Sequence, residues 1–378
     1  MAPSPLTPRF DPGVVWTGDE LVVWGGFTDR HTNGDPHDDG AANNPSTDSW
    51  RPLAPFPFDH HDGGSGAWVG GEVLFVVYGD ELDWGWDLVA YDPAQDQWRL
   101  VDEGRFEQLP TDEVIPVSGD ATVHLVRYLM AWGDQVVVIG SRSDSGRVWA
   151  TFDPADASWS DFTPFGFDDD PILDGLPQFI TADQIVGHFS AIAAPGPRGF
   201  LIDLAAGQVQ EMTPSGAPPW IGSEGVVDAG GGSVGLEYTQ EGDVRRVAYR
   251  FDARAENWVA ATAPDRGPMD DVGEVELVQV PGGHLWIGGL TVDDVRSGHN
   301  RLRSEAAALA ADADLTRWSS LPPAPIDLSR NGHVAVWTGE EVIVWGGATV
   351  DPAGPVNLAS VPLNDGARYR PGDVVAAD

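Results

Sequence analysis

WTGDELVVWGG occupies residues 16–26 of the chain, and WTGEEVIVWGG occupies residues 337–347. Eight of the eleven positions are identical, although more than 300 residues separate the two copies. Each copy belongs to two β-branched and aromatic runs joined by a Gly-Asp or Gly-Glu pair, a pattern typical of a β-hairpin. Near-identity at such a distance indicates an internal repeat.

A second motif recurs between the two ends of the chain. An aromatic residue, Asp-Pro, a short polar turn and Trp form YDPAQDQW (91–98) and FDPADASW (152–159), and FDARAENW (251–258) lacks only the Pro. Less regular copies begin at residues 43, 202, 311 and 369. The seven starts are 48, 61, 50, 49, 60 and 58 residues apart, which gives a mean period of about 54 residues.

Each repeat has room for four strands. Two β-like runs precede the motif, a third leads into its turn and a fourth follows its Trp. Four antiparallel strands in each of several repeats are typical of a β-propeller blade. We therefore predict an all-β, seven-bladed β-propeller of four-stranded antiparallel blades, with six blades as the alternative. The whole chain, 1–378, would be one domain, with blades at roughly 10–55, 64–105, 122–163, 177–215, 223–263, 273–323 and 331–378.

The opening duplication then marks the junction of a ring. The first and last repeats would be neighbours, because closing a propeller removes its exposed sheet edges. The last motif ends two residues before the C-terminus, which leaves little chain for a fourth strand. Either residues 373–378 supply a short one or residues 2–8 pair there, and the sequence leaves both open.

These features together resemble the kelch repeat, in particular the bacterial kelch and galactose-oxidase central-domain type of propeller. The diglycines that carry the resemblance are Gly25-Gly26, Gly288-Gly289 and Gly346-Gly347. The aromatic pairs are Tyr91 and Trp98, Phe152 and Trp159, and Phe251 and Trp258. The fourth repeat departs from the pattern, with no diglycine and with Val209 in place of Trp. The resemblance covers nearly the whole chain and implies the propeller fold.

Charge and composition restrict the partners and the chemistry. The formal net charge is −38, from 59 acidic and 21 basic residues, and every basic residue is Arg. Such a surface repels phosphate backbones and anionic lipid, so we predict no nucleic-acid partner and no membrane insertion. The absence of Cys excludes disulfides, thiolate catalysis and Cys-based zinc sites. The first ten residues lack the features of a signal peptide, so the compartment stays unknown, with an extracytoplasmic location favoured if a leader is absent from this chain.

The loops at the mouth of a propeller channel are the default ligand site. Connections into the first strand carry Arg9, His61, Arg330 and His333, whereas a loop between second and third strands carries Trp84 and Trp86. Trp beside carboxylates suits stacking on a sugar ring or a cation. We predict a binding module for a protein, carbohydrate or small-molecule ligand, with these residues as ligand-binding candidates.

Two other function classes remain open. A carbohydrate-active enzyme of the epimerase or lyase kind would use acid/base residues at the same mouth, for which His61, Glu224 and Arg330 are weak catalytic candidates. A copper radical oxidase is excluded, because its cross-linked cysteine is missing. A purely structural propeller within a larger assembly is the third class.

No cofactor and no metal site are predicted. Calcium is the ion considered, because GDPHDD (34–39) and FDDDP (167–171) are rich in oxygen ligands. Neither stretch has the spacing of an EF-hand loop.

Overall fold

Short strands joined by tight turns make up the regular structure of the chain. The residues that the computed structural model describes are 1–28, 36–58, 62–78, 86–103, 126–142, 146–165, 172–173, 178–190, 198–212, 227–228, 233–236, 248–252, 257–260, 272–293, 301–303, 307–312, 316–330, 332–350 and 360–371. All regular elements in these ranges are strands, and the sheets are antiparallel. The high Gly and Pro content accounts for this, since both residues disfavour helix interiors and favour turns. The described residues contain no helix of the length and apolarity that crossing a membrane requires.

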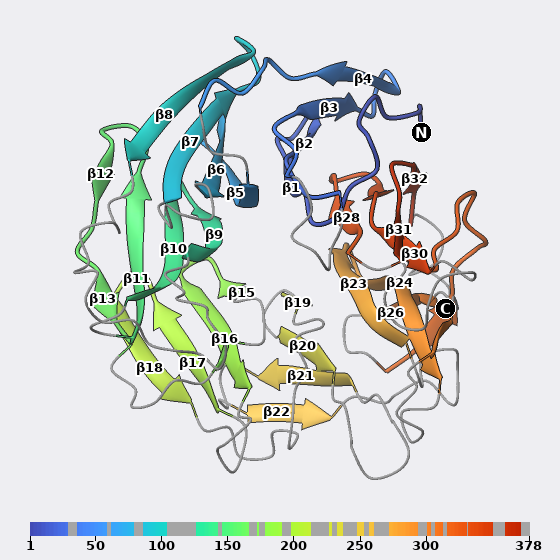
Figure 1. Ribbon diagram of the computed structural model, residues 1–378. Coiled ribbons are helices and arrows are strands. Elements are labelled where there is room, and N and C mark those ends of the chain that lie inside the picture. The colour runs from blue at the N-terminus through green and yellow to red at the C-terminus, as the bar shows by residue number, and fades with distance from the viewer. Residues whose placement is uncertain are drawn as a thin grey trace. The chain divides into compact units, whose positions relative to one another are not determined.

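The chain divides into two compact units, Met1–Asp170 and Pro171–Asp378. The first unit contains three sheets, each ordered as the chain runs (Figure 1). The first sheet consists of β1 (Gly13–Trp16), β2 (Leu21–Trp24), β3 (Gly40–Asn44) and β4 (Ser49–Pro52). The second consists of β5 (Asp62–Val69), β6 (Glu72–Tyr78), β7 (Trp86–Asp92) and β8 (Gln97–Glu103). The third consists of β9 (Val126–Trp132), β10 (Gln135–Arg142), β11 (Gly146–Asp153) and β12 (Ser158–Trp159), and β13 (Thr163–Pro164) also pairs with β11.

The second unit contains four further sheets of this kind and a small ribbon. In the fourth sheet, β14 (Ile172–Leu173) and β15 (Gln178–Thr181) pair with β16 (Gln184–Ser190), which is followed by β17 (Arg198–Asp203) and β18 (Gln208–Met212). The fifth sheet consists of β19 (Val227–Asp228), β20 (Ser233–Leu236), β21 (Ala248–Asp252) and β22 (Asn257–Ala260). The sixth consists of β23 (Val272–Val280), β24 (Gly283–Asp293), β26 (Ala307–Asp312) and β27 (Trp318–Ser320), with β25 (Arg301–Arg303) paired to β24. The seventh consists of β28 (Val334–Trp337), β29 (Val342–Trp345) and β32 (Gly366–Tyr369), and β30 (Ala348–Val350) pairs with β31 (Ser360–Pro362).

Six of the seven copies of the Asp-Pro…Trp motif lie at the hairpin between third and fourth strands, and the first residue of each lies opposite its last, seven positions later. The pairs are Asn43–Trp50, Tyr91–Trp98, Phe152–Trp159, Ile202–Val209, Phe251–Trp258 and Ala311–Trp318. The Asp side chain organises the turn: Asp92 Oδ1 accepts hydrogen bonds from the backbone N–H groups of Ala94 and Gln95. The all-β class and the four-stranded antiparallel sheets were predicted, and both are confirmed.

Apolar residues of neighbouring sheets form the core between them. In the first unit, Trp24 of β2 packs against Phe56, Phe75 and Trp98, with ring centroids 4.7, 5.6 and 5.4 Å apart. The first strands of successive sheets are in contact, β1 with β5 and β5 with β9. In the second unit the same holds for β15 with β19, β19 with β23, and β23 with β28. Buried apolar clusters lie between the first and second sheets, between the second and third, and between the sixth and seventh.

We expect Trp98→Ala to lower the free energy of unfolding by about 3–5 kcal/mol, because it leaves a cavity where four aromatic rings meet. Trp98→Phe should cost less, since part of the ring contact with Tyr91 remains. Urea denaturation measures both changes, and Gln95→Ala in the exposed turn is the control, expected within about 0.5 kcal/mol of the parent. A loss below about 1 kcal/mol for Trp98→Ala would contradict this account of the core.

Candidate functional site

A fully buried arginine holds the base of the loop between β2 and β3. Arg9 is 0% exposed, and its Nη1 donates hydrogen bonds to the carbonyl oxygens of Gly25 at 3.1 Å and Asp39 at 3.2 Å. The same nitrogen forms an ion pair with Asp39 Oδ1 at 2.8 Å. Nε and Nη2 donate to the carbonyl and hydroxyl oxygens of Thr7. The loop leaves the sheet at Gly25 and returns at Asp39, so one guanidinium fixes both of its ends.

The second unit contains the same arrangement around Arg330, which is also 0% exposed. Its Nη1 donates to the carbonyl oxygen of Gly346 at 3.0 Å and to Asp365 Oδ1 at 2.9 Å. Its Nε donates to the carbonyl oxygen of Asp327 at 2.6 Å. Arg330 therefore fixes the base of the loop that connects β29 to β32. We call these two arrangements the arginine clasps.

The clasps extend the duplication with which the sequence analysis began. Arg9 and Arg330 each lie four residues before the first strand of their sheet. The carbonyl that each binds belongs to the first glycine of a diglycine, and the carboxylate belongs to an Asp-Gly pair that opens the third strand. The backbone N–H of the first diglycine residue also donates to the carbonyl oxygen of this Asp, from Gly25 to Asp39 at 3.1 Å and from Gly346 to Asp365 at 3.0 Å.

The second glycine of the first diglycine is required by space and by backbone conformation. Gly26 has φ +89°, and a Cβ there would lie 2.5 Å from the carbonyl oxygen of Phe10. Phe10 and Phe27 exchange two backbone hydrogen bonds of 2.9 Å. The segment that enters β1 therefore lies at the same end of the sheet as the loop between β2 and β3.

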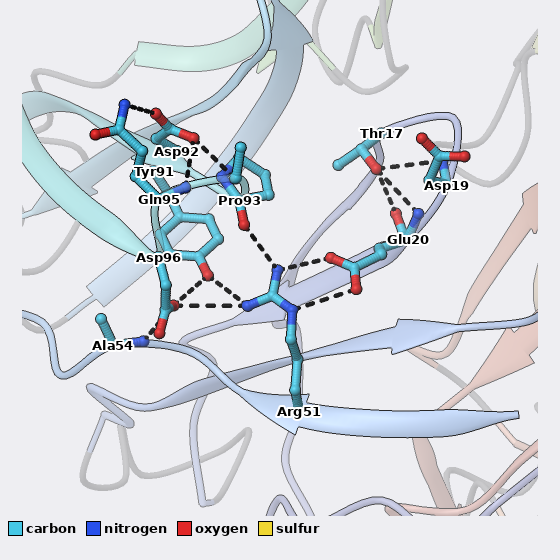
Figure 2. A network of polar contacts seen from close by, with 11 residues as sticks. Thr17, Asp19, Glu20, Arg51, Ala54, Tyr91, Asp92, Pro93, Gln95 and Asp96 are labelled. Carbon is cyan, nitrogen blue, oxygen red and sulfur yellow. Dashed lines mark hydrogen bonds and ion pairs between the residues drawn. The ribbon is translucent and has the colours of Figure 1, made fainter. Parts of the chain in front are cut away.

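The other end of the same sheet is tied to its neighbour by a polar network (Figure 2). Arg51 on β4 donates Nε and Nη2 to the two carboxylate oxygens of Glu20, at 3.2 and 2.6 Å, and Nη1 to the hydroxyl oxygen of Tyr91 at 2.8 Å. The Tyr91 hydroxyl donates to Asp96, which also accepts from the backbone N–H of Ala54. Strands β1 to β4 are thereby joined to the β7–β8 hairpin of the second sheet.

The network also perturbs the ionisation of its members. Burial, together with the hydrogen bond to Asp96, raises the pKa of Tyr91 to about 12, against the opposing charge of Arg51. Burial alone would raise the pKa of Asp96, but the hydrogen bonds from Tyr91 and Ala54 and the charge of Arg51 lower it. At neutral pH the phenol is therefore a donor and the carboxylate an acceptor, and the network has a structural role.

His333 is packed between the sixth and seventh sheets. The side chain is 2% exposed, and a Cβ on Gly288 of β24 would lie 2.1 Å from its Cε1. Burial and the charge of Arg330 lower the pKa of His333 to about 4, although the nearby carbonyls of Ile287 and Arg330 favour the protonated form. Neither ring nitrogen makes a hydrogen bond of good geometry. The imidazole is therefore neutral at pH 7 and enclosed by protein.

Three of the six predicted ligand-binding residues have described side chains, and the other three do not. Arg9, Arg330 and His333 are buried and contact their own sheets, so ligand binding by them stays a prediction and their observed role is to hold the fold. Trp86 begins β7, but its side chain lies outside the described residues. The remaining candidates, which lie wholly outside the described residues, are His61, Trp84 and Glu224. The convergence of an acid/base group with Arg330 stays a prediction.

The sequence analysis did not find the carboxylate partners of the clasps. The available signal was the Asp-Gly pair at 39–40 and 365–366, set opposite the diglycine in both copies. Within the ranges that the structure describes, no three His, Asp or Glu side chains are grouped so that they could hold a metal ion. The stretch 167–171 lies outside these ranges.

No protein-family model matches the chain, and no curated protein matches it significantly in sequence. The resemblance to kelch repeats therefore stays an expectation that depends on the repeat residues themselves. A function has to be inferred from the clasps, the loops that they hold and the charge of the chain.

We expect Arg9→Lys to lower the free energy of unfolding by about 2–4 kcal/mol, because the single nitrogen of lysine cannot replace both Nη1, which binds Gly25 and Asp39, and the Nε and Nη2 groups, which donate to Thr7. Amide hydrogen exchange at residues 25–28 and 36–40 should quicken more than exchange in β7 or β8. Arg317→Lys is the matched control, because its pair with Asp312 is exposed and should contribute less than about 1 kcal/mol. Equal losses for the two variants would contradict a clasp.

The buried imidazole predicts a pH dependence. The pKa of His333 is about 4 when folded and about 6.5 when unfolded, so the unfolded chain binds the proton more tightly and acid favours unfolding. Between pH 7.5 and 5 this group should remove about 2 kcal/mol of stability. The difference between parent and His333→Phe, measured by urea denaturation at both pH values, isolates it from the carboxylates. An identical pH dependence in both proteins would disprove the assignment.

Proposed function

We propose that the protein is a kelch-type β-propeller of seven blades, closed into a ring, that binds a partner through the loops between second and third strands. The repeat motif, its occurrence as a hairpin in successive antiparallel sheets, and the contacts between successive first strands support the architecture. Propellers present such loops around the mouth of a central channel, where ligands bind by default. The proposal therefore assigns function to one end of each sheet.

The contrast between the two ends of the first sheet carries this proposal. At one end the turns are short, and the Glu20–Arg51–Tyr91–Asp96 network ties them to the next sheet. At the other end Arg9 anchors a loop of thirteen residues between Gly26 and Gly40. A loop on a rigid stem can vary in sequence without loss of the fold, and binding residues are concentrated on such loops.

Charge favours a cationic partner surface. Ion pairs with carboxylates engage seven arginines whose side chains are described: Arg9, Arg51, Arg99, Arg317, Arg330, Arg368 and Arg370. Carboxylates of the chain thus already neutralise these arginines, whereas the 59 acidic residues of the whole sequence exceed its 21 basic ones. The excess negative charge would attract a basic protein or peptide over a distance of about 8–10 Å at physiological ionic strength.

We do not propose the carbohydrate-active alternative, because Arg330 spends its donors on Gly346, Asp365 and Asp327. The neighbouring His333 is neutral and enclosed at pH 7, so it cannot act as an acid toward a bound sugar. Of the three catalytic candidates, Arg330 thus has a structural role, whereas His61 and Glu224 lie outside the described residues.

Binding to immobilised Arg-rich, Glu-rich and neutral peptides, and to an oligosaccharide panel, tests the proposal. We expect the Arg-rich peptides to bind, with an affinity that falls at least tenfold between 50 and 500 mM NaCl. Replacing residues 29–35 by a Gly/Ser segment of equal length should weaken binding, whereas replacing residues 45–47 in the β3–β4 turn should not. Binding that survives the first replacement, or that is strongest for the oligosaccharides, would refute it.

A further inference from the structure

The two arginine clasps differ at the residue three positions after the arginine. In the second clasp this residue is His333, and in the first clasp it is Pro12. The buried imidazole of His333 lies against Gly288 of the sixth sheet, where a Cβ would approach three atoms of the ring within 3.0 Å. An ionisable side chain is therefore enclosed beside the second clasp, and the corresponding position of the first clasp cannot ionise.

The surroundings of His333 suit the neutral imidazole and oppose the imidazolium. Among the described residues, the charged group that faces the ring is the buried guanidinium of Arg330. Asp365 carries the opposite charge, but Arg330 engages both of its carboxylate oxygens, at 2.9 and 3.5 Å. The carbonyl oxygens of Ile287 and Arg330 lie near the ring and favour the cation, yet neither forms a hydrogen bond of good geometry with it. A second cation in this interior would therefore lack a carboxylate of its own.

We propose that protonation of His333 releases the second clasp, so that acid frees both ends of the loop between β29 and β32 while the sheet itself stays folded. An imidazolium beside a buried guanidinium is stabilised by reaching water. Because His333 follows Arg330 by three residues, the movement that exposes the ring also draws Arg330 away from the carbonyl oxygen of Gly346 and from Asp365. The loop then loses the guanidinium that holds its two ends together.

The imidazole of the first clasp has a different setting. His37 is half-buried where the loop between β2 and β3 returns to the sheet, and the charges of Asp38 and Asp39 there oppose that of Arg9. Its cation therefore has two carboxylates nearby, whereas the cation of His333 would face a guanidinium. We expect acid to open the second clasp and to leave the first one closed.

Other contacts hold the seventh sheet when its clasp opens. Strands β28 and β29 pair along their whole length of four residues, from Val334–Trp345 to Trp337–Val342. Strand β29 also pairs with β32. Val342 and Val344 are buried in the apolar cluster between the sixth and seventh sheets. The opening is thus confined to the base of the loop.

Amide hydrogen exchange tests the proposal, because backbone hydrogen bonds close the base of the loop. The reporters are the amide of Gly346, which donates to Asp365, and the amide of Leu363, which donates to Gly347. The pKa of His333 is about 4 in the closed clasp and about 6.5 when the ring is exposed. Protection of both amides, corrected for the intrinsic effect of pH on exchange, should therefore fall about 30-fold between pH 7.5 and 5.

The equivalent amides of the first clasp, Gly25 and His37, are the internal reference. His333→Phe should abolish the loss of protection in the second clasp, and His333→Gln is a second neutral variant in case the larger ring disturbs the packing on Gly288. The amides of β29 should stay protected throughout. Retained protection at the second clasp of the parent at pH 5, an equal loss in a folded variant, or an equal loss in β29 would overturn the proposal.

The consequence for binding rests on the function proposed above, since the loop between β29 and β32 joins a second strand to a third. The parent should bind Arg-rich peptides several-fold more weakly at pH 5 than at pH 7.5, and His333→Gln should lose less affinity. Peptides that bind neither protein at either pH would refute the binding function alone, because hydrogen exchange measures the clasp without a partner. An equal loss of affinity in the two proteins would overturn this consequence.

Discussion

The described sheets of the first unit depend on the tryptophan that ends each third–fourth strand hairpin. This tryptophan contacts a segment that precedes its own sheet in the sequence. Trp98 packs between two sheets and donates its indole N–H to the linker that leaves the first. Trp159 donates to Asp102 on the sheet before it, and Trp50 donates to Ala2. A short four-stranded sheet buries too little by itself, so the apolar ring supplies burial while the N–H fixes the position of the linker.

Two arginines of this strongly acidic chain, Arg9 and Arg330, are buried and hold loops in place. The clasps place guanidinium groups in the interior, where each donor must find an acceptor to offset desolvation. Carbonyl oxygens at the loop base provide most of these acceptors, and one aspartate provides the opposite charge. The guanidinium of arginine suits this task because its three nitrogens reach Thr7 as well as Gly25 and Asp39, whereas lysine has one nitrogen. The consequence is a fold held by internal cations beneath a surface rich in carboxylates.

The two ends of the first sheet are held by different interactions. Where Glu20, Arg51 and Tyr91 meet, ion pairs and hydrogen bonds link two sheets, and a change in any member disturbs the others. Where Arg9 binds Gly25 and Asp39, it fixes the two ends of the loop between β2 and β3. In the second clasp, Arg330 likewise fixes the two ends of the longer loop between β29 and β32. The binding proposal therefore concerns the loops at the end of the sheet that Arg9 holds.

The all-β class and the antiparallel hairpins could be predicted from the sequence, because period-two patterning, turn residues and the Asp-Pro…Trp motif act locally. The sequence also contains the duplication at residues 16–26 and 337–347. The burial of Arg9, Arg330 and His333 could not be predicted in this way, since burial depends on how segments from distant positions in the sequence pack around a side chain. The pairing of Asp39 and Asp365 with their arginines could not be predicted for the same reason. The partners are 30 and 35 residues apart in the sequence, and contacts over such distances do not produce a periodic sequence pattern.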